Sequence, residues 1–185
     1  MSRTNLRPST ARGFTLIELM VVVALTAVIL SLAAPSFSNF LAKRRVEGVA
    51  SELVTDLQYA RSEAVQRNAN VGVIVESSCY SVYVLGTTDA TSCTSRGTGS
   101  VELKTVQLAT GSATLVFTSN NSKAFIEFEP VRGMATNASS VDYSGYINVT
   151  GSSGSWTLRA VVTKIGRVKT CSPDSSMTGV SSDCT

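Results

Sequence analysis

Hydrophobic positions divide the chain into three parts with different periodicity. The first part is an apolar run, Phe14–Ala34, in which Glu18 is the one charged residue. At about 1.5 Å per helical residue, this run is long enough to cross a bilayer core of about 30 Å. The sequence therefore predicts a membrane-spanning helix over residues 14–35, which Pro35 is expected to interrupt because proline removes a backbone donor.

In the second part, apolar residues recur at steps of three and four, which places them on one face of an amphipathic helix over residues 36–68. These residues are Val46, Val49, Leu53, Leu57, Ala60 and Ala64. Glu63 lies off this face and can pair with Arg67 one turn later. Because Asn68-Ala69-Asn70 is typical of a helix end, the two parts together predict one long helix from Phe14 to Arg67.

From Val71 onward the period changes to two, which predicts a β-rich domain over residues 69–185. The expected strands cover residues 71–75, 80–84, 101–108, 113–117, 124–129, 146–150, 156–163 and 165–170. A loop rich in Thr, Ser and Gly separates the second and third strands, and Gly151–Ser155 is expected to connect a hairpin.

The cysteine pattern favours disulfides over a metal site. The chain has four cysteines and no histidine, and the cysteine spacing fits no zinc pattern. An even number of cysteines behind an export-like N-terminus is typical of an oxidising compartment. Three pairings are open, of which we favour Cys79–Cys93 and Cys171–Cys184 because each closes a short loop. The second would tie back the polar C-terminal tail, and no metal or cofactor is expected.

The net charge of +3 comes from the residues before the apolar run. Arg3, Arg7 and Arg12 lie there without an acidic residue and mark the cytoplasmic side by the positive-inside rule. Removing them from the 16 basic residues leaves 13, against 13 acidic residues. The remainder is therefore electrically balanced, and binding to a polyanion would need a local basic patch.

Glu18 needs an explanation, because an ionised carboxylate in an apolar segment is costly and usually has a partner or a function. Gly13 is a small residue just before the run, and cleavage after it would leave the run attached as an anchor. The new α-amino group on Phe14 would lie about one helical turn from Glu18. The alternative is that Glu18 reaches the lipid headgroups at the membrane interface.

The stretch Arg12-Gly13-Phe14-Thr15-Leu16-Ile17-Glu18-Leu19 resembles the class III signal sequence of type IV pilins and type II secretion pseudopilins. The resemblance implies that residues 1–13 are a leader, which a prepilin peptidase removes between Gly13 and Phe14 before methylating the new N-terminus. It also implies that Glu18 pairs with the terminal amine of an adjacent pilin subunit. The expected location is the bacterial inner membrane, with one span and a periplasmic domain, and then the pilus at the cell surface.

A second pattern narrows the class. Residues 53–68 read Leu-x3-Leu-x2-Ala-Arg-Ser-Glu-Ala-x2-Arg-Asn, which is similar to minor pilins and pseudopilins of the GspH/FimT family, and Trp156–Lys169 is a second matching block. The implied fold class is α+β: a long N-terminal helix, half transmembrane and half amphipathic, packed on an antiparallel, sandwich-like β domain. Residues 86–143 match no pattern that we can assign.

The resemblance implies one of two functions that members of this family have. Some members prime or cap a filament, and others capture DNA through a C-terminal Gly-Arg-x-Arg motif. Here the motif reads Gly166-Arg167-Val168-Lys169, and its final lysine keeps the charge but loses the planar fork of arginine. Strand alternation would put Arg167 and Lys169 on one face, where they could contact neighbouring phosphates of double-stranded DNA. Lys164 and Arg159 complete the candidate DNA-binding set.

We therefore predict a minor type IV pilin that contributes to DNA uptake in natural transformation. The alternatives are a priming minor pilin or a type II secretion pseudopilin without DNA binding, in which the basic residues only protect an exposed strand edge and Gly166 permits a turn. An enzyme is not expected, because a chain without histidine has no Ser–His or Cys–His pair. Glu127 and Glu129 alternate on a predicted strand, where an edge position is expected.

Overall fold

The computed structural model describes residues 13–95, 97–119, 125–136, 145–152 and 154–184, and for residues 32–36 it describes the backbone alone. The chain divides into two compact units, Met1–Asn39 and Phe40–Thr185. One helix, α1 (Leu16–Arg67), contributes to both units and confirms the predicted long helix. The expected interruption at Pro35 is wrong: the backbone on both sides of this residue keeps helical geometry, so the lost donor is tolerated inside α1.

Local side-chain and backbone contacts define both ends of α1. At its start, the backbone N–H of Glu18 donates to the hydroxyl of Thr15 at 3.3 Å, as in an N-terminal cap. At its end, Asn68 adopts a φ of +49°, and the N–H of Ala69 bonds the carbonyl of Ala64 at 3.2 Å. This is the left-handed C-terminal cap that asparagine tolerates, and it confirms the helix end predicted at residues 68–70.

Among the residues with described side chains, no helix is long and apolar enough to cross a membrane. The predicted span includes residues 32–34, whose side chains lie outside that part of the chain.

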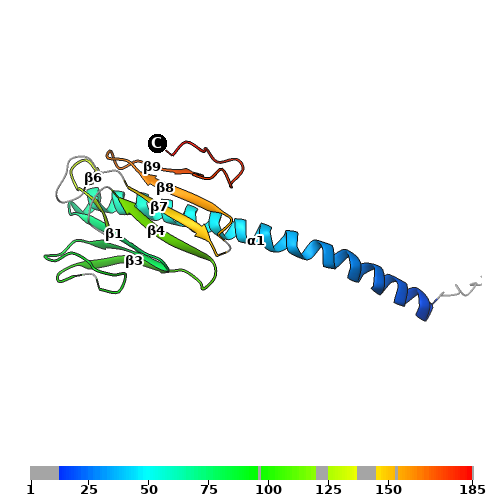
Figure 1. The fold of residues 1–185 in the computed structure, drawn as a ribbon. Coiled ribbons are helices and arrows are strands. Elements are labelled where there is room, and N and C mark those ends of the chain that lie inside the picture. Colours follow the sequence, from blue (N-terminus) through cyan, green and yellow to red (C-terminus); the bar gives the residue numbers. More distant parts are fainter. Residues whose placement is uncertain (1–12, 96, 120–124, 137–144, 153, 185) are drawn as a thin grey trace, which may run out of the picture. The chain divides into compact units, whose positions relative to one another are not determined.

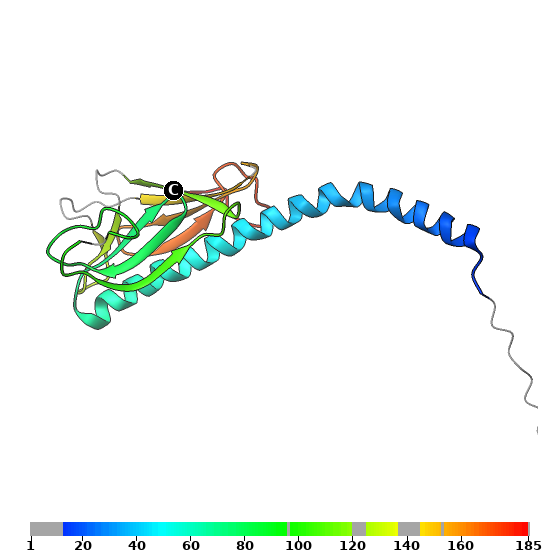
Figure 2. The same ribbon diagram turned by 90° about the horizontal axis from the view of Figure 1, so that it is seen from below.

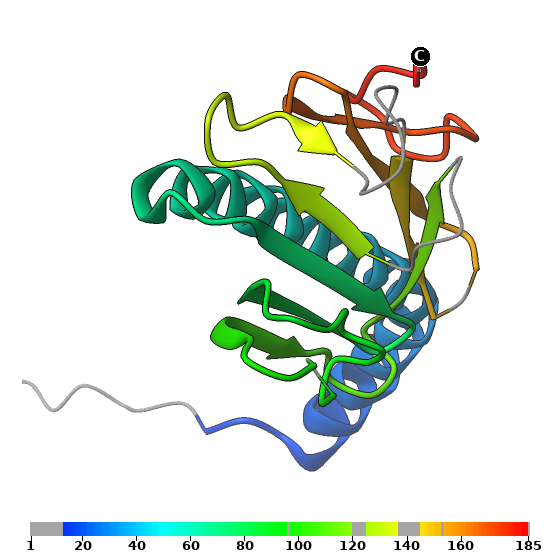
Figure 3. The same cartoon turned by 90° about the vertical axis from the view of Figure 1, so that its left-hand side faces the viewer.

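The second unit contains two antiparallel sheets (Figures 1 and 3). Sheet A has the strand order β3-β2-β1-β5-β6, and sheet B has the order β4-β7-β8-β9. The strands of sheet A are β1 (Val71–Glu76), β2 (Cys79–Val84), β3 (Val101–Gln107), β5 (Phe125–Phe128) and β6 (Ala135–Thr136). Those of sheet B are β4 (Ala113–Ser119), β7 (Gly145–Gly151), β8 (Thr157–Val162) and β9 (Val168–Cys171).

One hydrophobic core joins both sheets to the second half of α1, which lies against the strands in Figure 2. The helix contributes a buried stripe with alternating steps of four and three: Val46, Ala50, Leu53, Leu57, Ala60 and Ala64. In β7 and β8 every second residue is buried, so sheet B turns one face to this core. A smaller cluster around Ile74 and Tyr83 covers the other face of sheet A. The expected α+β, sandwich-like fold class is confirmed.

The structure also corrects parts of the predicted β region. The strand expected at residues 165–170 begins only at Val168, because the preceding residues form a turn. β6 was not expected, since two residues are too few to show a period. Glu127 does not lie on a sheet edge: it is 5% exposed on β5, between β1 and β6, and accepts a hydrogen bond from Asn70 at 2.8 Å.

A buried carboxylate joins α1 to sheet A. Asp56 is 5% exposed and accepts a hydrogen bond of 2.7 Å from the hydroxyl of Tyr80, and the ammonium of Lys104 lies 2.7 Å from the same oxygen. Glu52 lies farther from this ammonium, at 3.4 Å. Burial, followed by the bond to Asp56, raises the pKa of Tyr80 far above its usual range, so its phenol remains a donor.

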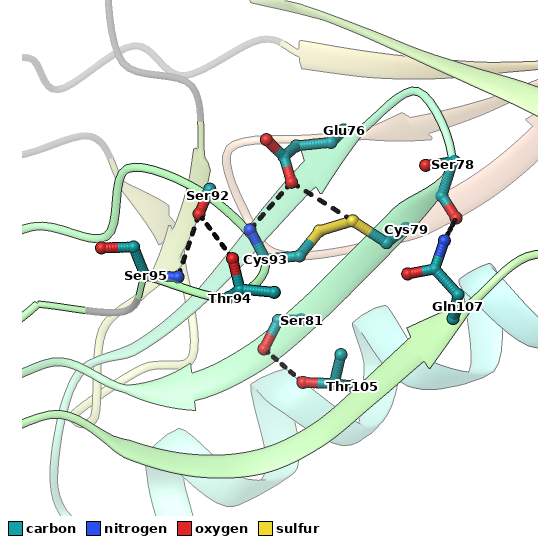
Figure 4. The surroundings of a disulfide bond; sticks show 10 residues. All are labelled: Glu76, Ser78, Cys79, Ser81, Ser92, Cys93, Thr94, Ser95, Thr105 and Gln107. Atoms are coloured by element: carbon teal, nitrogen blue, oxygen red, sulfur yellow. Dashed lines mark hydrogen bonds between the residues drawn. A yellow bond between two sulfur atoms is a disulfide. The ribbon is translucent and has the colours of Figure 1, made fainter.

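Both favoured disulfides are confirmed. Cys79 pairs with Cys93, and Cys171 pairs with Cys184, which returns the C-terminal tail to β9. A carboxylate oxygen of Glu76 lies beside the first disulfide and accepts the backbone N–H of Cys93 at 2.9 Å (Figure 4). Glu76, Cys79 and Cys93 are close enough to suggest a metal-ligand cluster, but both sulfurs are used in the disulfide and are not available as thiolate ligands.

Candidate nucleic-acid interface

The predicted Gly-Arg-Val-Lys motif lies in the hairpin between β8 and β9. The N–H of Thr163 donates to the carbonyl of Arg167 at 2.9 Å, and the N–H of Gly166 donates back to the carbonyl of Thr163 at 2.8 Å. Gly166 has a φ of +73°, which is the left-handed position that follows the tight part of such a turn. The hairpin therefore places Arg167 directly after the turn, with its side chain exposed.

Gly166 is also packed against two segments far away in the sequence. A Cβ atom at this position would lie 2.1 Å from the carbonyl oxygen of Gly133 and 2.9 Å from Nε of Arg61. Nε of Arg61, on α1, itself donates to the same Gly133 carbonyl at 2.9 Å. We call this contact of Arg61, Gly133 and Gly166 the interlock. It holds the hairpin turn against the helix, and only glycine fits between them.

The structure separates the predicted DNA-binding residues into two groups. Arg159 and Lys169 belong to the outer face of sheet B, where Arg159 is paired with Cys171 and Lys169 with Val161. The guanidinium of Arg159 lies 3.9 Å from the ring centroid of Tyr146 and also donates to Asn148 at 2.9 Å. Arg159 and Lys169 are thus diagonal neighbours on one surface.

Arg167 belongs to a different surface, a groove of about 700 Å³ beside α1. We call it the arginine groove, and its lining residues are Gln58, Arg61, Ser62, Val65, Arg132, Gly166, Arg167 and Val168. Lys164 lies in the turn beside the groove, and its carbonyl accepts the N–H of Ala135 at 3.0 Å. Arg167, just before β9, is exposed and lines the groove, whereas Lys169, within β9, is half-buried and does not line it.

Sequence reasoning missed Arg61 and Arg132 as members of this surface. Arg61 stands in the Ala-Arg-Ser-Glu-Ala pattern, which indicated only the protein class, and Arg132 precedes Gly133 in a segment without clear periodicity. The one signal that could have found Arg61 is its position on the helix, one residue after the buried Ala60 and hence beside the packed face.

At the N-terminal site, Gly13 and Phe14 precede α1, and Phe14 is 83% exposed. Glu18 lies in the first helical turn, where a negative charge is favoured by the helix dipole. Glu18 therefore also contributes to the N-terminal cap of α1, through its backbone N–H and through the position of its charge in the first turn. Cleavage after Gly13, methylation and pairing of Glu18 with another subunit stay predictions.

Comparison with solved structures shows the same architecture in pilus and secretion proteins. The minor pseudopilin EpsH of the Vibrio cholerae type 2 secretion system superimposes with a TM-score of 0.53 at 12% identity, covering 70% of this chain and 98% of that one. The type IV minor pilin FimU of Pseudomonas aeruginosa gives a TM-score of 0.52 at 18% identity, covering 70% and 90%. These likenesses show that the chain has a pilin-like fold.

Two family models match the sequence. The prokaryotic N-terminal methylation motif matches residues 8–34, and the model of the type II transport protein GspH matches residues 49–166. Since the second match covers more than half of the chain, the chain belongs to the GspH family, as a GspH/FimT-like type IV minor pilin or pseudopilin.

Curated relatives share shorter segments. The type IV major fimbrial protein FimA of Dichelobacter nodosus is 46% identical over 44 residues, or 24% of this chain and 28% of FimA. The pilin-like protein PilA1 of Thermus thermophilus is 45% identical over 67 residues, or 36% of this chain and 41% of PilA1. The chain thus matches less than half of the length of these relatives, none of which is named as an enzyme.

Proposed function

We propose that this protein is a minor type IV pilin that is processed after Gly13, anchored in the inner membrane by the first half of α1, assembled with other pilin subunits, and able to bind DNA through the β8–β9 hairpin. The observation that carries the DNA-binding part is the exposed Arg167, which the interlock presents on a rigid turn. Sequence-independent contacts of this kind bind phosphates and hold a protein on the DNA backbone.

Assembly is supported by the surface of the first unit. Between Phe14 and Leu30, the large apolar side chains are 50–83% exposed in the isolated chain. Lipid, and later neighbouring helices, would cover such a surface, because apolar area of this extent is not left in contact with water. The carboxylate of Glu18 lies within this surface, where a cleaved N-terminal amine of another subunit would neutralise it.

We expect Glu18→Leu to reduce incorporation into filaments by at least about tenfold, because the apolar side chain no longer attracts the terminal amine of a neighbour. Glu18→Asp keeps a carboxylate and is the matched control, for which partial incorporation is expected. The measurement is the amount of this subunit in sheared filaments, with the mature N-terminus determined by mass spectrometry. Equal incorporation of Glu18→Leu, or a mature N-terminus other than Phe14, would contradict the proposal.

For DNA binding, we expect the full chain in neutral detergent to bind a fluorescently labelled duplex weakly and with steep salt dependence, because few phosphates are contacted. Arg167→Ala should weaken binding about fivefold and reduce the logarithmic salt slope by about one. Lys169→Arg, which restores the guanidinium fork, should strengthen binding. Fluorescence anisotropy at several salt concentrations measures all three.

Arg45→Ala provides a control for the loss of one positive charge, since Arg45 is exposed on α1 outside the arginine groove. If the wild type does not bind, or if Arg167→Ala and Arg45→Ala bind equally well, the DNA-binding role is wrong. The protein would then act as a priming pilin or as a secretion pseudopilin. Deleting its gene and scoring piliation and transformation separately distinguishes these roles in the cell.

A further inference from the structure

We propose that the arginine groove is a binding site for a phosphate group of the DNA backbone, in which Arg61 and Arg132 act together with Arg167. This inference rests on the proposed DNA-binding function and extends it from the hairpin to α1 and to the turn after β5. The three arginines come from segments that are distant in sequence, and they line one groove. Convergence of guanidinium groups from separate elements is the arrangement that binds phosphate oxygens.

The charge balance of the groove favours an anionic ligand. Within the part of the chain that the structure describes, neither Arg61 nor Arg167 forms an ion pair, although Arg61 is half-buried. Half-buried charges are normally compensated, because removing a charge from water is unfavourable. A guanidinium that lines an open groove without a carboxylate partner is available to a ligand that supplies the negative charge.

Arg61 is held in place before any ligand binds. Its Nε donates to the carbonyl of Gly133, which uses one N–H of the guanidinium and leaves the two terminal nitrogens for other acceptors. Because the same carbonyl packs against Gly166, Arg61 and the hairpin that presents Arg167 are positioned together. A binding site built in this way loses little conformational entropy on binding.

Arg132 is exposed and can exchange its acidic partner for a ligand. Its side chain is 70% exposed, and its Nε lies 3.1 Å from a carboxylate oxygen of Glu129 three residues earlier. Glu129 is the acidic partner that the structure shows for this group, and it would compete with a phosphate for Arg132. With Glu129 included, the three guanidinium groups still leave an excess of positive charge in the groove. The groove has a volume of about 700 Å³, which is large enough for one nucleotide of a DNA strand.

The decisive variants act on Arg132, because its exposed side chain leaves the fold intact when it is removed. In the full chain in neutral detergent, Arg132→Ala should weaken binding of the labelled duplex about fivefold and lower the logarithmic salt slope by about one. Glu129→Gln should strengthen binding, since it removes the competing carboxylate. Arg44→Ala is the matched control: Arg44 is 64% exposed and pairs with Glu47 three residues away, but lies outside the groove.

The outcomes separate this inference from the proposed function. If Arg167→Ala weakens binding while Arg132→Ala matches Arg44→Ala, the DNA role stands, Arg167 acts from the hairpin without Arg132, and the inference about the groove is wrong. If no variant changes binding, both proposals are wrong. Phosphatidylglycerol has the same phosphodiester chemistry, and its addition to the micelles should not displace DNA. Displacement that requires Arg132 would assign the groove to lipid headgroups and overturn the inference.

Discussion

Replacement of Gly166 by alanine should lower the free energy of unfolding by about 2–5 kcal/mol, because two unfavourable terms add. A side chain at a φ of +73° is strained, and its Cβ would lie 2.1 Å from the Gly133 carbonyl oxygen. That oxygen belongs to the backbone and also accepts the Arg61 hydrogen bond, so it cannot move away without breaking the interlock. Chemical denaturation of the full chain in detergent, followed by fluorescence of Trp156, measures the loss.

Gly111→Ala separates the two terms. Gly111 has nearly the same backbone angle, a φ of +76°, but a Cβ there would meet nothing within 4 Å. This control should therefore show only the strain of about 1–2 kcal/mol. Equal losses at the two positions would mean that the close contact in the interlock does not exist. Gly166→Ala should also weaken DNA binding, whereas Gly111→Ala should leave it unchanged.

The second large effect is expected at Asp56, where we predict that Asp56→Ala lowers the free energy of unfolding by about 3 kcal/mol. The substitution removes the acceptor of the Tyr80 hydroxyl, which lies on a fully buried side chain, and also the principal ion-pair partner of Lys104. Because the three residues lie on α1, β2 and β3, the change weakens the attachment of sheet A to the helix. The same denaturation experiment measures it.

A double-mutant cycle identifies the source of this loss. Tyr80→Phe removes the donor, so Asp56→Ala combined with Tyr80→Phe should cost less than the sum of the single changes. Glu52→Gln is the control, because Glu52 is half exposed and 3.4 Å from Lys104, and an effect below about 1 kcal/mol is expected. Additive losses in the cycle would show that the Tyr80–Asp56 hydrogen bond is not the origin of the effect.

Helix, strands and disulfides could be predicted because their signals are local. The apolar stripe of α1 repeats along one helix, and its predicted members are buried except Val49, which is half-buried while Ala50 takes the central position. Helical spacing of three or four residues places both Val49 and Ala50 near the apolar stripe. Packing against the sheets determines which of the two is fully buried. Cys79–Cys93 and Cys171–Cys184 span 14 and 13 residues, so short loop closure was sufficient to favour these pairs.

The candidate site was predictable in part. The Gly166–Lys169 motif and the turn at Gly166 follow from the chain itself, but alternation alone placed Arg167 on a strand that begins one residue later. The hydrogen bonds between Thr163 and Arg167 form a turn there, and this geometry directs Arg167 to the arginine groove while Lys169 joins Arg159 on sheet B.

The class of protein, the long helix with its C-terminal end, most strands and the cysteine pairs were predictable from the sequence, because each depends on residues within one element or one short loop. The contact of Arg61 with Gly133 and Gly166, and the groove that Arg132 shares with Arg167, result from tertiary packing. Arg61 and Gly133 are 72 residues apart, and their contact exists because α1 and both sheets pack on one core. Periodicity within one element does not show how elements so far apart in the chain pack against one another.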